Sequence, residues 1–370
     1  MKNQKKHIVI DARIRPSSTG RYIDRVLEHL QTIDTDNKYT VLLSKGDEWK
    51  PKAKNFSAQT CRFRSFSFNP IDQLLFSRQL YKLKADLVHF AMTGYQPLFY
   101  FGNQVTTTND LTMFKFTRRG RLPKWAHRLR MWGYHLLIWQ AHKKAKYILT
   151  FSEYTRDAVA KFHTFTSRKI VITPLATEPP LTEKSMPVKE VDGRYIMYTG
   201  SSFPHKNLKR LIKAFARISE SDPSLQLVLV GKKEYHSNQL QKWVKEKGIT
   251  NVIFTGFVSD GELKWLYENT LAYVFPSLSE GFGLPSLEAM AHGAPVASSN
   301  ASCLPEVNGE AAQYFDPLDI EDMARAIKKV VGGNSLRQKL VTAGYRQVKK
   351  YSWKRTAQQT LEVYKKVLEK

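Results

Sequence analysis

Cysteine is scarce in this chain of 370 residues, which contains only Cys61 and Cys303. The two lie far apart in the sequence and show none of the close spacing that cysteine metal sites require. The sequence therefore offers no cysteine-based metal site, and it favours reduced thiols in a cytoplasmic protein.

Long apolar runs are absent as well. No run reaches the roughly 18 apolar residues that mark a membrane-spanning helix. The N-terminus begins with lysines but reaches Asp11 after a single short apolar stretch, Ile8 to Ile10. That stretch is too short for the apolar region of a secretory signal. We therefore expect neither a transmembrane segment nor a secretion signal.

Acidic side chains are outnumbered by basic ones. The chain has 33 Asp and Glu against 58 Lys and Arg, which gives a formal net charge of +25. Such an excess favours a polyanionic partner. Nucleic acid, an acidic membrane surface and an anionic substrate all fit, and charge alone does not choose among them.

Short β-rich runs alternate with helical patterns along most of the chain. Residues 7–11 are typical of a strand, and residues 21–31 of a helix with one apolar face. Further strands are expected at residues 39–43, 86–90, 104–108, 147–151, 170–173, 195–199, 225–230, 252–255, 272–275 and 295–298. This alternation predicts parallel sheets with helices on both faces.

The chain is longer than one core usually holds, so we expect two domains. Residues 176–187 have three prolines and no periodicity, as linkers do. The prediction is an α/β protein with two doubly wound, Rossmann-like domains that face each other across a cleft. The expected parts are domain 1–176, linker 177–194, domain 195–350, and a helix over 351–370 that is a candidate to pack back on the first domain.

The most informative segment is residues 275–296. It predicts a buried strand, a glycine-bearing turn and a helix that Pro285 opens and Gly293 closes. Free N–H groups and the positive dipole end make such a helix start an anion site. Glu280 on the turn and Glu288 in the first helical turn flank it. They suit a pair that binds sugar hydroxyls, a glycosidase-like acid and base, or a dipole-stabilising Glu288 with a solvated Glu280.

Two strand–loop–helix junctions are candidate phosphate sites. Residues 200–207 form one, in which Lys206 would present a compact positive charge to a diphosphate. Its plain alternative is a surface lysine beside an N-capping Asn207. In the other junction Gly20 could let the backbone approach a donor phosphate or sugar, and the alternative is a simple turn capped by Thr19.

Polar residues also follow the strand predicted at residues 104–108. Asn109 and Asp110 stand at its carboxyl end, where side chains point into the cleft of such a fold and could bind sugar hydroxyls. An Asx-turn that caps the loop explains the pair equally well.

The segment 115–146 combines cations with aromatic side chains. The cations are Lys115, Arg118, Arg119, Arg121, Lys124, Arg128, Arg130, Lys143, Lys144 and Lys146, and the interleaved aromatic residues are Phe114, Phe116, Trp125, Trp132, Tyr134 and Trp139. Such a mixture suits an anionic bilayer surface, and it also suits nucleic acid. A solvated helical face with its aromatic residues in the core is the plain alternative.

Together these motifs resemble the retaining family-4 glycosyltransferases of GT-B fold. Residues 280–285 and 288–296 are similar to that family's two-glutamate motif, and residues 304–317 resemble the segment that follows it. Gly200 to Asn207 is similar to the phosphate-gripping junction, and residues 20–22 to the N-terminal loop of polysaccharide-type members. The likeness covers nearly the whole chain, because residues 151–153 and 351–353 also fall in the expected order.

The resemblance implies roles for particular residues. Glu288 would bind the ribose hydroxyls of a nucleoside-diphosphate sugar, Glu280 its sugar and Lys206 its diphosphate. The amides of Phe282, Gly283 and Leu284 would assist at the phosphates or sugar, with Gly20 and Gly200 also at the donor, and Phe257 and Val258 would line the base. The family further implies transfer with retained anomeric configuration and no metal or other cofactor. No Asp-x-Asp motif is placed to hold Mg²⁺ against a diphosphate, which agrees.

Two positions depart from the family pattern. Asn109 stands where members often carry a histidine, and Ser201 stands where a basic residue often follows the glycine of the phosphate junction. Either Lys206 carries the diphosphate without a close arginine, or another cation such as Arg13 or Arg21 contributes.

We therefore predict a retaining hexosyltransferase that moves mannose from GDP-mannose to a glycan or lipid-linked acceptor. Its catalytic candidates are Glu280, Lys206, Asn109 and Asp110. We expect it in the cytoplasm, on the inner face of a membrane that the segment 115–146 contacts, with no nucleic-acid partner. A UDP-sugar transferase or epimerase of the same fold is one alternative, and a basic nucleic-acid-binding protein is another.

Overall fold

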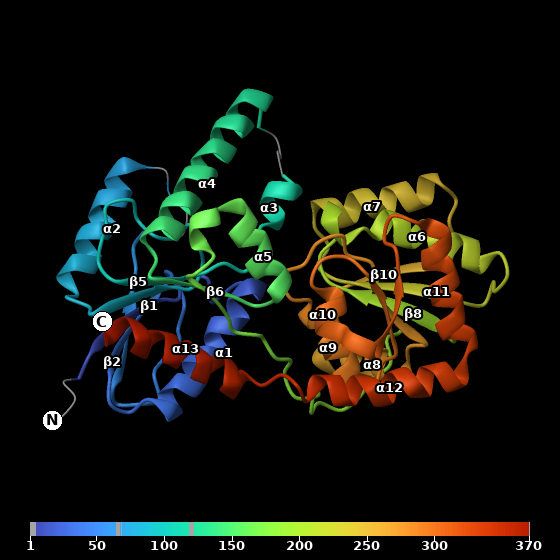
Figure 1. Ribbon diagram of the computed structural model, residues 1–370. Coiled ribbons are helices and arrows are strands. Elements are labelled where there is room, and N and C mark those ends of the chain that lie inside the picture. The colour runs from blue at the N-terminus through green and yellow to red at the C-terminus, as the bar shows by residue number, and fades with distance from the viewer. Residues whose placement is uncertain (1–4, 64–66, 68, 118–121, 370) are drawn as a thin grey trace. The chain divides into compact units, whose positions relative to one another are not determined.

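The computed structural model describes residues 5–63, 67, 69–117 and 122–369. The chain forms two compact units. The first joins residues 1–175 to the C-terminal residues 352–370, and the second comprises residues 176–351. Each unit is a parallel sheet with helices on both faces (Figure 1). The predicted doubly wound α/β class is confirmed.

The sheet of the first unit has seven parallel strands in the order β3-β2-β1-β4-β5-β6-β7. Their bounds are β1 His7–Asp11, β2 Lys38–Leu43, β3 Phe56–Thr60, β4 Leu87–Phe90, β5 Gln104–Thr107, β6 Tyr147–Thr150 and β7 Ile170–Ile172. Strands β1 and β4 are neighbours, and the chain leaves them toward opposite edges of the sheet. This is a topological switch point, beside which doubly wound sheets bind ligands.

Helices cover both faces of this sheet (Figure 1). Helices α1 (Arg21–Ile33) and α13 (Trp353–Leu368) lie on one face, and α2 (Pro70–Lys82), α4 (Lys124–Lys144) and α5 (Glu153–Phe162) on the other. A short helix, α3 (Thr112–Lys115), follows β5. The helical period predicted for α1 is confirmed, because its apolar residues from Ile23 to Leu30 are buried.

The sheet of the second unit has six parallel strands in the order β10-β9-β8-β11-β12-β13. Their bounds are β8 Tyr195–Thr199, β9 Gln226–Val230, β10 Val252–Gly256, β11 Ala272–Phe275, β12 Val296–Ser299 and β13 Ala312–Phe315. One face carries α6 (Leu208–Ser219), α7 (Tyr235–Glu246) and α11 (Ile320–Gly332). The other carries α8 (Asp260–Asn269), α9 (Leu284–Ala291), α10 (Leu304–Asn308) and α12 (Asn334–Val348). Here the switch point lies between β8 and β11.

Sequence periodicity located the central strands and missed two at the edges. Strands β1, β8 and β11 have the predicted bounds. Strand β3 was not predicted, because it is an edge strand in which only Phe56 is buried, and so it lacks apolar alternation. Strand β13, at an edge of the second sheet, was missed for the same reason, since Gln313 and Tyr314 are only partly buried.

The last helix, α13, packs on the first sheet through a buried histidine. The Nδ1 atom of His89 lies 2.6 Å from the Tyr364 hydroxyl on α13, and its Nε2 atom lies 2.8 Å from the Thr107 hydroxyl. Burial lowers the pKa of His89 to about 3, so the imidazole is neutral in the folded protein. A neutral ring has one donor and one acceptor nitrogen, which matches these two partners.

This histidine makes the stability of the protein depend on pH. In the unfolded chain His89 takes up a proton below a pH of about 6.5, whereas in the fold it does so only near pH 3. Unfolding therefore binds a proton in this window, and the free energy of unfolding falls by about 1.4 kcal/mol per pH unit as the pH drops. We expect the free energy of unfolding, measured in urea between pH 4 and 6, to depend less steeply on pH in His89→Gln than in the wild type. The difference in slope should correspond to about one proton. An unchanged slope would contradict this assignment.

Candidate active site

The switch point of the second unit brings two loops together. After β8 the chain passes Gly200 and a short turn, Pro204–Lys206, into α6, and after β11 it passes a glycine-bearing turn into α9. The Leu278 amide in the second loop donates to the His205 carbonyl in the first at 2.8 Å. The two loops thus form one continuous surface at the carboxyl ends of adjacent strands.

An ion pair joins these loops. The Nζ atom of Lys206 lies 2.6 Å from Oε1 of Glu280, and the two side chains are only 16% and 13% exposed. The reading of Lys206 as a plain surface lysine is therefore wrong. The same partial burial means that few water molecules screen the two charges, so a ligand at this position meets strong fields of both signs.

Asn207 stands at the N-cap position of α6 and fixes the loop that carries Lys206, but its side chain does not cap the helix. Its backbone is left-handed, with φ 63°, and its side-chain amide donates to the Pro276 carbonyl at 3.1 Å and the Pro317 carbonyl at 2.7 Å. The N-cap position expected for Asn207 is thus confirmed, while its side chain makes no capping hydrogen bond to α6. Asn207 instead ties the Lys206 loop to the two loops that follow β11 and β13.

The backbone of Glu280 is held from the neighbouring loop. Its amide donates to the Ser302 hydroxyl at 3.1 Å, and the thiol of Cys303 donates to its carbonyl at 3.3 Å. Burial, together with the nearby charge of Glu280, raises the pKa of the Cys303 thiol, so this thiol stays protonated and able to donate. Sequence reasoning gave neither residue a role, since a lone serine and cysteine carry no recognisable pattern.

Gly283 allows the turn to enter α9. Its φ is +95°, a left-handed value that other residues adopt at a cost. A Cβ atom there would also lie 2.6 Å from Cδ2 of Leu304. The helix that follows starts at Leu284, with Pro285 in its first turn, and the first N–H groups of a helix have no intrahelical partner. The positive end of α9 therefore lies a few residues beyond Glu280.

Glu288 lies further along α9 than predicted. Because the helix begins at Leu284, Glu288 belongs to its second turn, and no acidic residue stands in the first. It is half-buried. The predicted helix stop is confirmed, since Gly293 follows α9 with φ +77°. Glu288 thus stays a candidate for binding a ligand hydroxyl, while the interpretation as a dipole-stabilising first-turn residue is wrong.

The expected base-binding residues lie at a sheet edge. Phe257 and Val258 follow β10, which is separated from β8 by β9. Phe257 is 80% exposed and Val258 is buried. An exposed ring at the carboxyl end of the sheet offers a face on which a base can stack. Among the described residues, no hydrogen bond or ring contact joins Phe257 or Val258 to Lys206 or Glu280.

Asn109 and Asp110 behave differently from each other in the first unit. The Asp110 carboxylate accepts from the Thr112 amide at 2.7 Å, so the Asx-turn is confirmed for this residue. The Asn109 side chain is 6% exposed, and neither its Oδ1 nor its Nδ2 atom has a hydrogen-bond partner among the described residues. A buried amide without partners costs free energy and needs an explanation, and contact with a substrate is one that can be tested.

Gly20 is required by close packing. A Cβ atom on Gly20 would clash with the carbonyl oxygen of Ile14. The turn before α1 is capped by Ser17, whose hydroxyl accepts from the Gly20 amide at 3.1 Å, and not by Thr19. The alternative of a turn capped at Thr19 is therefore wrong in its residue.

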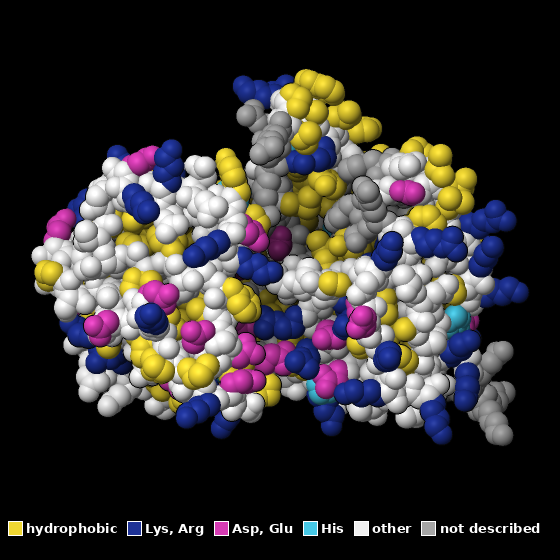
Figure 2. Space-filling model, turned by 180° about the vertical axis from the view of Figure 1, so that it is seen from behind, with side chains coloured by type: hydrophobic (Ala, Val, Ile, Leu, Met, Phe, Trp, Pro, Cys, Tyr) yellow, Lys and Arg dark blue, Asp and Glu magenta, His cyan; other side chains and the backbone are white. Residues whose placement is uncertain are grey.

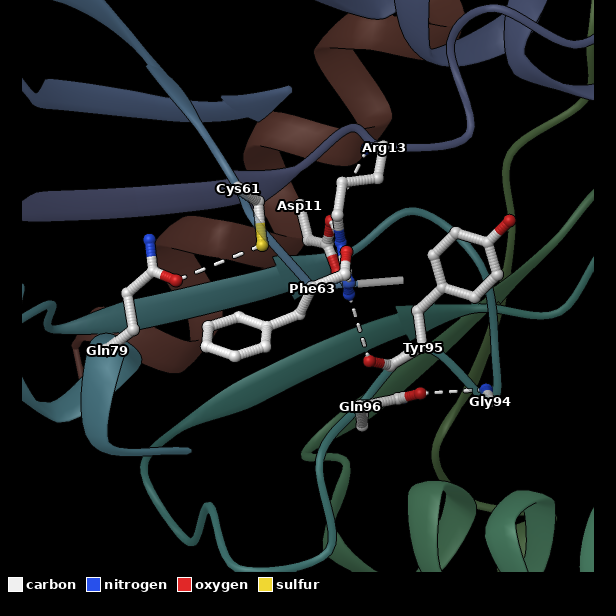
Figure 3. Close-up of polar contacts among 8 residues, drawn as sticks. All are labelled: Asp11, Arg13, Cys61, Phe63, Gln79, Gly94, Tyr95 and Gln96. Atoms are coloured by element: carbon white, nitrogen blue, oxygen red, sulfur yellow. Dashed lines mark hydrogen bonds and ion pairs between the residues drawn. The ribbon is translucent and has the colours of Figure 1, made fainter. Parts of the chain in front are cut away.

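Arg13 is committed to the interior of the first unit (Figure 3). It forms a bidentate pair with Asp11, in which Nε donates at 2.7 Å and Nη2 at 2.6 Å. Nη1 also donates to the Phe63 carbonyl and Nη2 to the Tyr95 carbonyl, each at 3.2 Å. The side chain is 1% exposed, so Arg13 is not available to a diphosphate. Arg21, the other suggested cation, opens α1 and is half-buried.

Sequence reasoning also missed Gln96 near this switch point. It follows β4 in the loop Gly94–Gln96, and its Oε1 accepts from the Gly94 amide at 2.9 Å (Figure 3). Its Nε2 is buried without a hydrogen-bond partner among the described residues. The only sequence signal was a glycine shortly after a predicted strand, which is common in turns.

Solved structures identify the fold. A sucrose-phosphate synthase from Thermosynechococcus elongatus aligns with a TM-score of 0.77 and 19% identity, over 99% of this chain and 100% of that one. WaaG, a glycosyltransferase involved in lipopolysaccharide biosynthesis, aligns with a TM-score of 0.74 and 17% identity, over 96% and 99% of the two chains. The two α/β units thus have the GT-B fold of glycosyltransferases.

Sequence relatives identify the family. Residues 182–347 match the model for glycosyl transferases group 1. The chain is 30% identical over 272 residues to O-antigen chain mannosyltransferase B of Escherichia coli, covering 70% of each. It is 33% identical over 198 residues to O-antigen chain mannosyltransferase RfbU of Salmonella typhimurium, covering 53% of this chain and 54% of the relative. The chain belongs to the glycosyl transferases group 1 family and is a glycosyltransferase.

Asn109 offers a test that separates a binding role from a structural one. Replacing its unpartnered buried amide by an apolar side chain of similar size, in Asn109→Leu, should leave the free energy of unfolding unchanged or raise it by about 1–3 kcal/mol. Transferase turnover should fall at the same time, since the amide would no longer meet the substrate. Urea unfolding and turnover are measured on the same preparations. A variant that is less stable but fully active would show that the amide serves only the fold.

Proposed function

We propose that this glycosyltransferase moves mannose from GDP-mannose to a glycan or lipid-linked acceptor, with retained anomeric configuration. The observation that carries the proposal is the Lys206–Glu280 ion pair at the switch point of the second unit. The choice of mannose is supported by the O-antigen mannosyltransferases among the relatives. A third relative, from Mycolicibacterium hassiacum, is named as an MMP alpha-(1->4)-mannosyltransferase and is 30% identical over 227 residues.

The two charged groups of the pair would bind different parts of the donor. Lys206 would bind the diphosphate and stabilise the negative charge that grows on it as the sugar leaves. Glu280 would accept hydrogen bonds from the sugar hydroxyls. The amides at the start of α9, from Phe282 to Leu284, add positive potential beside the phosphates. Lys206 and these amides would supply the positive charge that the leaving group needs, in a reaction that we propose requires no metal.

Glu288 would bind the ribose hydroxyls of the donor. The His292 side chain links the backbone of Glu288 to the segment before the second sheet. Nδ1 of this ring donates to the Glu288 carbonyl at 2.8 Å, and Nε2 accepts from the Leu181 amide at 3.0 Å. Both contacts require the tautomer that is protonated on Nδ1. The backbone of Glu288 is thereby fixed, so the carboxylate meets the donor with little loss of conformational freedom.

The proposed chemistry needs no protein base. The bond between the anomeric carbon and the diphosphate oxygen breaks, and the electron pair stays on the diphosphate. The acceptor hydroxyl approaches the oxocarbenium-like sugar from the same face and gives its proton to the departing diphosphate oxygen. A new glycosidic bond forms on the face that the diphosphate left, which retains the configuration.

A panel of nucleotide sugars tests the donor. A ligand that binds only the folded protein raises its melting temperature. At a ligand concentration 100 times the dissociation constant, the free energy of unfolding increases by about 2.7 kcal/mol. We expect GDP-mannose to give the largest shift among GDP-, UDP-, ADP- and TDP-sugars, and Glu288→Ala to reduce it. A larger shift with UDP-sugars would favour the UDP-sugar transferase or epimerase. No shift with any of them, together with salt-sensitive nucleic-acid binding, would favour the nucleic-acid alternative.

We further propose that helix α4 places the enzyme on an anionic membrane, at the inner face in the cytoplasm. None of the described helices is both long and apolar enough to cross a bilayer. Helix α4 instead exposes an apolar stripe with a spacing of four and three residues, formed by Trp125, Leu129, Trp132, Leu136 and Trp139. These side chains are between 39% and 71% exposed, so the alternative in which the aromatic residues lie in the core is wrong for the three tryptophans.

Exposed cations on α4 support the proposal that this helix contacts an anionic membrane. Lys124, Arg128 and Lys143 are exposed on the same helix, and Nζ of Lys143 lies 4.7 Å from the centre of the Trp139 ring. Figure 2 shows hydrophobic side chains gathered over the projecting helix with Lys and Arg beside them. Each cation near an anionic surface adds about 1 kcal/mol of attraction, and interfacial tryptophans add apolar contact. The predicted cations Arg118, Arg119 and Arg121 lie outside the described residues.

Liposome co-sedimentation tests this surface. The triple variant Trp125→Ser, Trp132→Ser and Trp139→Ser should bind vesicles of anionic lipid at least ten-fold more weakly than the wild type. A control variant, Tyr235→Ser with Leu318→Ser, removes exposed apolar groups from the second unit and should bind as the wild type does. Equal binding by the wild type and the triple variant would contradict the proposal.

A further inference from the structure

A pocket beside the edge strand of the first sheet has no role in the chemistry described so far. It has a volume of about 460 Å³ and lies between the carboxyl end of β3 and helix α2. Three cations line it: Arg62, Arg78 and Lys82. The remaining lining groups are neutral, and Phe63, Leu75 and Gln79 are among them.

Among the residues that the structure describes, no acidic group neutralises the three cations of this pocket. No carboxylate lines the pocket, and within the described ranges none of the three forms an ion pair with Asp or Glu. Positive charges gathered in one concave site repel one another, and an anion there offsets that repulsion. Two guanidinium groups and an ammonium group match the geometry and charge of a phosphate, which accepts several charge-assisted hydrogen bonds.

The wall of the pocket is fixed from behind (Figure 3). The Phe63 carbonyl accepts from the buried Arg13, which is itself locked to Asp11. On the helix side, the Gln79 side chain lies 3.9 Å from the Cys61 sulfur. Burial raises the pKa of this thiol, so Cys61 brings no negative charge to the site. These contacts anchor the backbone at Phe63 and the Gln79 side chain, while the exposed cations Arg62, Arg78 and Lys82 give the pocket its positive charge.

One side of the pocket continues into an exposed apolar surface. Leu75 lines the pocket and is 43% exposed, and its neighbours on α2, Ile71 and Leu74, are 65% and 58% exposed. Figure 2 shows hydrophobic side chains gathered over this part of the first unit. An apolar surface that begins at a cationic pocket fits a ligand with an anionic head and an apolar chain.

We propose that this pocket binds the phosphate group of an amphiphile, whose chain lies along Leu75, Leu74 and Ile71. Arg62, Arg78 and Lys82 hold the phosphate, and the helix α2 surface holds the chain. That this amphiphile carries the acceptor rests on the proposed function. The binding itself does not, because the pocket belongs wholly to the first unit.

Titration calorimetry of the full chain with dodecyl phosphate, below its micelle concentration, tests the proposal. We expect saturable binding, at least ten-fold weaker binding of inorganic phosphate, and none of neutral dodecyl maltoside. The variant Arg62→Gln, Arg78→Gln and Lys82→Gln should lose at least ten-fold in affinity for dodecyl phosphate. The control Lys328→Gln, Lys329→Gln and Lys349→Gln removes the same charge from exposed positions of the second unit and should bind as the wild type does.

The chain-binding part has its own variant. Leu74→Ser with Leu75→Ser should bring the affinity for dodecyl phosphate close to that for inorganic phosphate. Equal affinities for the two ligands in the wild type would overturn the lipid part and leave a site for soluble phosphate compounds. Equal losses in the charge variant and its control would overturn the pocket itself. The donor-induced melting shift should persist in all these variants, so a failure here is distinguishable from a failure of the proposed donor site.

Discussion

The ion pair between Lys206 and Glu280 joins the two loops of the candidate active site. The two residues come from loops that leave adjacent strands toward opposite edges of the sheet, so they meet only because β8 and β11 are neighbours. The surrounding contacts serve this pair: Asn207 ties down the lysine loop, and Ser302 and Cys303 hold the backbone of Glu280. Burial of this degree costs desolvation free energy, because both charges give up most of their water, and the binding role that we propose would explain why the pair is kept.

The first unit also has an ion pair at its switch point, but that pair is fully buried. At its switch point Arg13 and Asp11 are fully buried and neutralise each other, so this cation is structural. Other cations of this unit lie at the surface, on α4 and around the pocket beside α2, next to exposed apolar side chains. These cations make up part of the net charge of +25, and surfaces of this kind suit the anionic, partly apolar partners that we propose.

The sequence predicted the fold class and the motif positions because both depend on local patterns. Strand β11, the glycine turn and Pro285 follow one another in a way that few other structures allow, so the helix start was found from sequence. The Lys206–Glu280 contact was not, since 74 residues separate the partners and periodicity gives no distances. The burial of Arg13 was missed for the same reason: an arginine two residues after a strand looks the same whether it pairs with Asp11 or faces a ligand.

The most direct test of this account measures what the diphosphate contributes to binding. Calorimetry gives the ratio of dissociation constants between guanosine and GDP for the wild type and for Lys206→Met, with Lys209→Met, an exposed neighbour, as control. We predict that this ratio is at least ten-fold smaller in Lys206→Met than in the wild type, and that it is unchanged in the control. An equal ratio in all three proteins would show that Lys206 does not bind the diphosphate, and the role assigned to the ion pair would be wrong.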